Sequence, residues 1–108
     1  MTVIEVHLAY DLVPGIDEKS YFDWMKEAIV PVLKSNGIVE VRAQRNIKES
    51  PGVLVIGLWE SLEDWTKFSQ SEGWYSLTNT LQNTFAANLR IEVWGPSPFL
   101  PQPLRPRR

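Results

Sequence analysis

One change of hydrophobic period, at Ser61, constrains the fold of this chain more than any other feature. Residues 53–59 form a short apolar run rich in β-branched side chains, which is typical of a buried strand. After Ser61 the apolar residues recur every three or four positions, which indicates helix; they are Leu62, Trp65, Phe68, Trp74, Leu77, Leu81 and Phe85. Ser61 and Asp64 have the spacing of a capping pair, and residues 71–73 interrupt the pattern. The segment therefore predicts one strand followed by two helices.

The rest of the chain predicts three more strands and one more helix. Apolar and polar residues alternate over 2–10, 38–47 and 88–95, as they do in strands. A helix is expected over 17–35, because Asp17 is a good N-cap and a core stripe follows at helical spacing: Phe22, Met25, Ile29, Val32 and Leu33. Residues 48–52 are expected to form a hairpin loop. This order predicts an α+β, ferredoxin-like fold, in which helices cover one face of a four-stranded antiparallel sheet.

Such a sheet leaves its second face open. The alternation places one apolar set of each strand there, and we expect the open face to hold Ile4, Val6, Leu8, Leu54, Ile56 and Leu58. A sheet face this apolar is not stable in water on its own. We therefore predict a homodimer in which two open faces pack together to form an α/β barrel.

The last 13 residues differ in composition from the body. Residues 96–108 contain five of the eight prolines and three arginines, which is typical of an extended, polyproline-like segment without a core. The 108 residues therefore divide into one domain over 1–95 and a Pro/Arg-rich tail over 96–108. The tail is either a loose terminus, an anchor on the second subunit, or a docking segment for another protein.

Composition excludes several classes of function. The net charge of −2 gives no general attraction to nucleic acid, and no apolar run is long enough to span a membrane. The chain has no cysteine and one histidine, so it lacks the ligands for a thiolate or His-rich metal site. No phosphate-binding loop or dinucleotide motif is present, so we expect no cofactor. The start of the chain does not have the pattern of a signal peptide, and we expect a cytoplasmic protein.

The motifs around the period change resemble those of a known superfamily. The pattern Trp59-Glu60-Ser61, then Asp64-Trp65 and Phe68, then Gly73-Trp74 is similar to the dimeric α/β-barrel proteins, and to their antibiotic-biosynthesis-monooxygenase-like branch in particular. The resemblance covers about residues 2–95. It implies a pocket between the helices and the sheet of each subunit. Members of the superfamily include cofactor-independent oxygenases of polycyclic aromatics, haem-degrading enzymes, cyclases and isomerases.

The resemblance also implies a set of site residues. By analogy, the pocket is lined by His7, Trp59, Trp74, Tyr75 and Thr78. Strand alternation also predicts that His7 and Trp59 share the face under the helices, with His7 as the general base. Glu5 lies on the same face, about 7 Å along the strand, which is too far for a tight direct partner without rearrangement. We therefore predict His7 and Tyr75 as catalytic residues and Trp59, Trp74, Thr78 and Glu5 as substrate-binding residues. Each of them also has an ordinary structural interpretation, as a core or surface residue.

These features together predict a function. A base beside an aromatic pocket, without metal or flavin, favours a cofactor-independent oxygenase that acts on a small aromatic or enolisable metabolite. Thr78 stands where the haem-degrading branch has its haem-ligating histidine, which argues against haem degradation. A cyclase or isomerase using the same pocket remains an alternative, as does a non-catalytic homodimer that binds a ligand or another protein.

Overall fold

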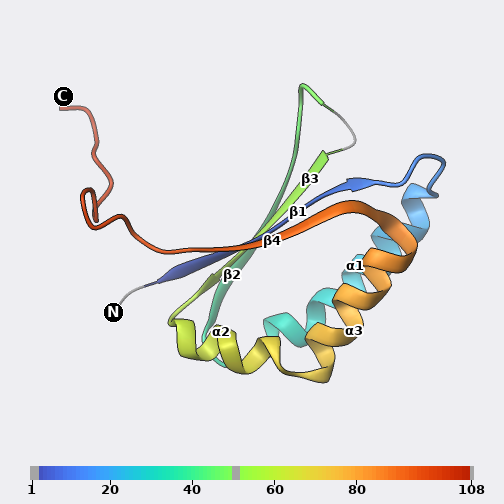
Figure 1. Ribbon diagram of the computed structural model, residues 1–108, viewed down its shortest axis with the longest axis horizontal. Coiled ribbons are helices and arrows are strands. Elements are labelled where there is room, and N and C mark those ends of the chain that lie inside the picture. The colour runs from blue at the N-terminus through green and yellow to red at the C-terminus, as the bar shows by residue number, and fades with distance from the viewer. Residues whose placement is uncertain (1–2, 50–51, 108) are drawn as a thin grey trace.

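The computed structural model describes residues 3–49 and 52–107 and shows an antiparallel sheet with helices on one face (Figure 1). The elements are β1 (Ile4–Leu12), α1 (Glu18–Leu33), β2 (Ile38–Arg45), β3 (Gly52–Trp59), α2 (Leu62–Ser69), α3 (Glu72–Thr80), a π-helical turn (Leu81–Phe85) and β4 (Ala86–Trp94). The strand order is β2-β3-β1-β4, and every neighbouring pair is antiparallel. The predicted ferredoxin-like fold is confirmed. The centre of the predicted hairpin loop, at residues 50–51, lies outside the described residues.

Local sequence signals set the ends of the helices. Asp17 accepts a hydrogen bond from the backbone N–H of Lys19 at the start of α1. Ser61 accepts one from the N–H of Asp64 at the start of α2, and its hydroxyl donates to the Asp64 carboxylate. Ser71 caps α3 in the same way, so the predicted break between the two helices is present. After α3 the chain runs through the π-helical turn directly into β4.

The buried face of α1 differs from the predicted one. Phe22 and Leu33 were expected in the core, but their exposed fractions are 60% and 55%. The helix is rotated so that Tyr21 and Trp24 face inward, where both rings pack against Phe85. The expectation for Phe22 and Leu33 is therefore wrong. The reason is that two larger aromatic side chains, one turn apart, remove more apolar surface from water when they face the sheet.

The register between β1 and β3 decides which residues lie under the helices. Ile4 is opposite Trp59, Val6 is opposite Gly57, and Leu8 is opposite Val55. Directly paired residues share a face, and Ile4, Val6 and Leu8 belong to the core packed beneath the helices.

The expectation that Ile4, Val6 and Leu8 lie on the open face is therefore wrong. The residues that do face that side are Leu54, Ile56 and Leu58, as predicted. Strand β3 is apolar on both of its faces, so its own hydrophobic pattern is compatible with either orientation in the sheet. Only pairing with β1, whose apolar set is buried under the helices, distinguishes the two.

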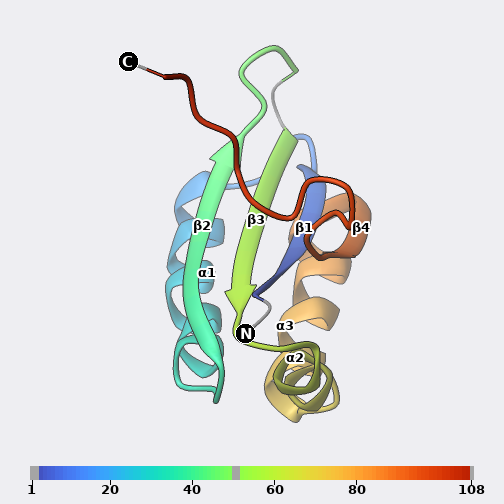
Figure 2. The same cartoon turned by 90° about the vertical axis from the view of Figure 1, so that its left-hand side faces the viewer.

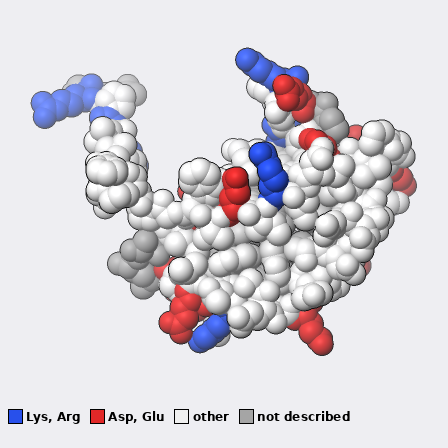
Figure 3. Space-filling model, in the orientation of Figure 1, with Lys and Arg blue, Asp and Glu red and all other residues white. Residues whose placement is uncertain are grey.

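The tail leaves the end of β4 and extends away from the body (Figures 1 and 2). Phe99 and Leu104 are 94% and 78% exposed there. On the face drawn in Figure 3, acidic and basic side chains are scattered and do not gather into a patch of one sign. Within residues 3–49 and 52–107, no helix has the length and apolar character needed to cross a membrane.

A matched pair of glycines tests the junction between α1 and β2. Gly37 and Gly15 both have positive φ, of 90° and 79°. An added Cβ on Gly37 would overlap the Asp64 side chain, whereas on Gly15 it would meet nothing within 4 Å. We expect Gly15→Ala to cost about 1–2 kcal/mol from left-handed strain alone, and Gly37→Ala to cost about 1–3 kcal/mol more because Asp64 must move. Denaturant unfolding of both variants measures the difference, and equal destabilisation would contradict this steric contact.

Candidate functional site

A small apolar cavity lies between the sheet and the helices. Its lining comes from β1, β2, β3 and all three α-helices, and its volume is about 40 Å³. This is room for about one water molecule, so the cavity in this conformation is too small for an aromatic ring. The protein's own side chains largely fill the space.

Four aromatic rings make one wall of this cavity. Trp65 and Trp74 pack edge to face with their ring centres 4.8 Å apart. Trp59 lies 5.6 Å from Trp65 and 5.3 Å from Phe68. Trp59 is 1% exposed and Trp74 is half-buried, so Trp74 is the ring at the rim. These separations are those of favourable aromatic contacts, and the rings, which are tilted or edge to face to one another, form an apolar wall.

A pair of phenols lies at the other end of the cavity. Tyr10 lines the cavity and is 4% exposed, and its hydroxyl is hydrogen-bonded to the hydroxyl of Tyr21. Burial is the main cause that raises the pKa of Tyr10, and the hydrogen bond to Tyr21 raises it further. Burial also raises the pKa of Tyr21. Both phenols are therefore neutral near pH 7, and each hydroxyl carries one proton that it can donate.

Neither tyrosine of this pair was among the predicted site residues. Tyr10 continues the alternating set of Ile4, Val6 and Leu8, and the whole set was assigned to the wrong face. Tyr21 stands one turn before Trp24, on the inward face of α1 that the sequence pattern also missed. The signal that could have found Tyr10 is its phase in β1. If the alternating apolar residues of β1 are assigned to the core, Tyr10 falls on the same side, at the cavity.

The indole of Trp59 provides a second polar group. It reaches over Gly57, where an added Cβ would lie 3.1 Å from the indole Nε1. Among the described residues, no acceptor is within hydrogen-bond distance of this N–H. Gly57 thus leaves space on the cavity wall beside the indole N–H of Trp59, a residue that is 1% exposed as a whole.

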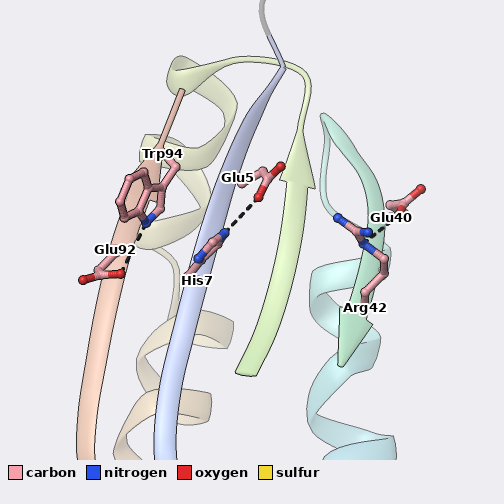
Figure 4. Close-up of polar contacts among 6 residues, drawn as sticks. All are labelled: Glu5, His7, Glu40, Arg42, Glu92 and Trp94. Carbon is pink, nitrogen blue, oxygen red and sulfur yellow. Dashed lines mark hydrogen bonds and ion pairs between the residues drawn. The ribbon is translucent and has the colours of Figure 1, made fainter. Parts of the chain in front are cut away.

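His7 and Glu5 lie on the opposite face of the sheet (Figure 4). His7 pairs with Ile56, one residue out of phase with the pairs that carry Val6 and Leu8 to the cavity. The expectation that His7 and Trp59 share a face is therefore wrong. A molecule in the helix-side cavity is separated from the imidazole by the sheet itself.

On the open face, His7 takes part in a polar cluster. Its Nε2 is 2.9 Å from Oε1 of Glu5, so the expectation that Glu5 is too distant is also wrong. The two side chains lean toward each other along the strand, which shortens the separation expected from their backbone spacing. The Trp94 ring centre is 5.9 Å from that of His7, and the Trp94 indole donates to Glu92 at 3.3 Å.

The open face is hollowed beside this cluster. A groove of about 950 Å³ runs over it, and its ionisable lining residues are His7, Asp11, Arg45, Glu49, Arg90 and Glu92. The Arg42 and Glu40 side chains pair at 3.2 Å near the other edge of the sheet. In the described part of the chain, no group of three or more His, Asp or Glu side chains is arranged to hold a metal ion.

Two other predicted site residues lie outside both hollows. Tyr75 is on the outer side of α3 with 75% of its surface exposed. The Thr78 hydroxyl donates to the backbone carbonyl of Trp74 at 3.0 Å, within its own helix. The structure thus brings Trp59 and Trp74 together at one cavity and places His7 and Glu5 together elsewhere. Tyr75 and Thr78 join neither group.

Comparison with solved structures identifies the fold. SnoaB, described as a cofactor-independent oxygenase from Streptomyces nogalater, has a TM-score of 0.76 at 9% identity, covering 94% of this chain and 100% of that one. A candidate antibiotic biosynthesis monooxygenase from Bordetella bronchiseptica has a TM-score of 0.72 at 17% identity, covering 86% and 95%. The chain shares its fold with both of these proteins.

A further neighbour is described as a dimeric protein of unknown function with a ferredoxin-like fold, from Bacteroides fragilis. It has a TM-score of 0.63 at 10% identity, covering 86% of this chain and 95% of that one. No family model matches the sequence, and neither does any curated protein. The resemblance predicted from the sequence is confirmed for the fold.

The phenol pair predicts a dependence of stability on alkaline pH. The ordinary phenol pKa is 10.0, and both tyrosines have raised values in the folded state. The folded chain therefore keeps protons that the unfolded chain releases above pH 10. This contribution to stability is complete below pH 10 and is lost as the pH rises further, by at most about 1.4 kcal/mol per pH unit for each group.

We expect the free energy of unfolding of Tyr10→Phe to fall less steeply with pH than that of the wild type between pH 10 and 11. Denaturant unfolding at pH 9, 10 and 11 measures the two slopes. Tyr75→Phe, which removes a phenol that is 75% exposed, is the matched control and should follow the wild type. Identical slopes for all three proteins would show that the Tyr10 phenol is not held neutral by the fold.

Proposed function

We propose that the chain is a cofactor-independent oxygenase that acts on a flat aromatic or enolisable small molecule bound between the sheet and the helices. The observation that carries this proposal is the aromatic cavity on the helix side of the sheet, formed by Trp59, Trp65 and Trp74. The fold it occupies is shared with SnoaB, which is described as a cofactor-independent oxygenase. A wall of indole rings suits an aromatic substrate, because aromatic side chains bury a large area at a low cost in conformational entropy.

Binding requires the cavity to widen. Its present volume of about 40 Å³ is much smaller than a ring system. Trp74 is the half-buried member of the aromatic wall and stands just after the break between α2 and α3. Movement of this side chain opens the cavity with the least disturbance of the core, and the substrate then packs between the rings of Trp74 and Trp65.

The chemistry proposed here uses the substrate as the only source of electrons. A methylene carbon between two aromatic rings loses a proton to give a carbanion, which reacts directly with O₂. The net change is R₂CH₂ + O₂ → R₂C=O + H₂O, in which one oxygen atom stays on carbon and the other leaves as water. Among the described residues that line the cavity there is no carboxylate, amine or imidazole. The proton therefore passes to water, which favours substrates that ionise near neutral pH.

The same observation supports a second candidate, a non-catalytic protein that binds a small aromatic molecule. A cyclase or isomerase must move protons within its site, whereas the cavity wall holds neutral phenol and indole groups in place of a base. A binding protein needs only the apolar surface and the donors.

The proposed assembly is a homodimer formed through the open face. Leu54, Ile56 and Leu58 form an apolar column along β3 on that face, and charged residues flank it on β1, β2 and β4. Ile56 is already 6% exposed in the single chain, whereas Leu54 and Leu58 are partly exposed, and two copies packed face to face would remove the two leucine side chains from water. The dimeric neighbour from Bacteroides fragilis has the same fold.

Ligand binding at the cavity can be measured by tryptophan fluorescence. We expect 1,8-dihydroxyanthrone, a flat and enolisable phenol, to quench the emission of the wild type in a saturable way. Trp74→Phe should weaken this binding, because the ring at the rim loses part of its contact area. Trp94→Phe, which changes an indole on the opposite face, is the matched control and should leave the affinity unchanged.

Oxygen uptake with the same compound separates the two candidates. We expect the wild type to consume O₂ faster than the spontaneous reaction, and Trp74→Phe to reduce the enzymatic rate. Saturable binding without additional O₂ uptake would favour the binding protein. Loss of binding in Trp94→Phe but not in Trp74→Phe would place the binding site on the open face of the sheet. This result would contradict both the oxygenase and the binding protein proposed for the helix-side cavity.

The dimer predicts a particle of twice 12.4 kDa in light scattering after size exclusion. We expect Leu58→Asp to shift the particle to the monomer mass, because it places a carboxylate in the apolar column. Leu62→Asp, at a 58% exposed position on α2, is the control and should remain dimeric. A monomeric wild type at micromolar concentration would rule out this assembly.

A further inference from the structure

We propose that Tyr10 is the hydrogen-bond donor that binds a carbonyl or enolate oxygen of the ligand, and that Tyr21 is the positioning residue that orients the Tyr10 hydroxyl. This inference rests on the proposed binding of a flat molecule in the helix-side cavity. It adds a chemical requirement to that function. The ligand must carry an oxygen acceptor at the end of its ring system that points toward β1 and α1.

The phenol pair has one more proton than its own hydrogen bond uses. Two phenol hydroxyls carry two protons, and the hydrogen bond between Tyr10 and Tyr21 uses one of them. The other proton has no acceptor among the side chains and backbone groups of the described residues. With a ligand oxygen in the cavity, Tyr21 donates to Tyr10 and Tyr10 donates to the ligand. Hydroxyl rotation alone makes this change.

The two rings lie one behind the other at the cavity wall. Tyr10 lines the cavity, and its side chain is almost completely buried. Tyr21 stands behind it and is held by edge contact with Phe85 at 5.5 Å and by Trp24 at 6.3 Å. A donor fixed from behind by aromatic packing loses little freedom when it binds an acceptor, which is the arrangement that stabilises developing negative charge on oxygen.

The indole N–H of Trp59 is a second donor on the cavity wall, and it faces the space above Gly57. A ligand oxygen placed there can accept a hydrogen bond from this N–H. Tyr10 and Trp59 therefore both favour the same ligand chemistry.

The register sets the distance between these two donors. Tyr10 is opposite Val53, and Gly57, beneath the Trp59 indole, is four residues further along β3. Four residues of strand span about 13 Å. The two donors thus lie near opposite ends of the cavity, and an elongated ring system with oxygen at one or both ends fits them.

Protonation supports the same assignment. Burial raises the pKa of Tyr10, so the hydroxyl keeps its proton throughout the physiological range. A neutral phenol donates a hydrogen bond to a carbonyl oxygen and donates a stronger one when that oxygen becomes negative. The pair therefore binds the ligand and also favours its enolate form.

The test compares 9-fluorenone with fluorene, two flat molecules of nearly the same shape that differ in one carbonyl group. We expect the wild type to bind fluorenone more tightly, and Tyr10→Phe to reduce that preference by about fivefold to tenfold, the value of one hydrogen bond. The affinity for fluorene should stay unchanged, which shows that the cavity is intact. Tyr75→Phe is the matched control and should retain the full preference.

The carbonyl stretching band of bound fluorenone reports the hydrogen bond directly. We expect a shift to lower frequency in the wild type, its loss in Tyr10→Phe, and a smaller shift in Tyr21→Phe, where Tyr10 can still donate but is no longer oriented. A Tyr21→Phe variant that matches the wild type in both measurements would contradict the positioning role. If Tyr10→Phe does not fold, an unshifted band in the wild type by itself rules out the donor.

The outcomes separate this inference from the function on which it rests. Binding of both compounds with equal affinity would overturn the role of Tyr10 and leave the proposed pocket in place. Binding of neither compound would overturn the pocket and the inference together. An unchanged preference for fluorenone in Tyr10→Phe would place the donor elsewhere on the cavity wall.

Discussion

The pairing of β1 with β3 is the constraint on which the rest of the structure depends. With Ile4 opposite Trp59, every second residue of both strands is committed to the same side of the sheet. The apolar set of β1 then meets the helices, and the indole of Trp59 joins the aromatic residues of α2 and α3. A shift of one residue would exchange the two faces and place Glu5 and His7 beneath the helices, where their polar groups would need new partners.

This pairing also separates two chemical environments by the thickness of one sheet. The helix side is apolar and offers only neutral donors, from Tyr10 and Trp59. The open side carries the ionisable groups, among them the Glu5–His7 pair and the Arg42–Glu40 pair. Charges are costly to bury and remain where water or a second subunit can reach them. The proposed chemistry on the helix side consequently depends on hydrogen bonding and exclusion of water rather than on a base.

The comparisons show how little sequence this fold requires. Neighbours with 9% to 17% identity have nearly the same arrangement of strands and helices. Alternation in the strands and helical spacing after Ser61 are enough to specify the architecture. The walls of the cavity are free to differ between proteins that share it, so function must be argued from the side chains that line the cavity.

The sequence by itself determined the elements, their order, the break between α2 and α3, and the capping residues Asp17 and Ser61, because these follow from local spacing and local hydrogen bonds. The family resemblance, and not the pattern, placed Trp59 and Trp74 at the pocket, and both line the cavity. Tertiary structure decided the orientation of β1, the rotation of α1, and therefore the positions of His7, Phe22 and Tyr10. β3 is apolar on both faces, and α1 has aromatic side chains at 21, 22 and 24, so each pattern fits two orientations. Only the packing of one element against another, which buries the larger apolar area, selects between them.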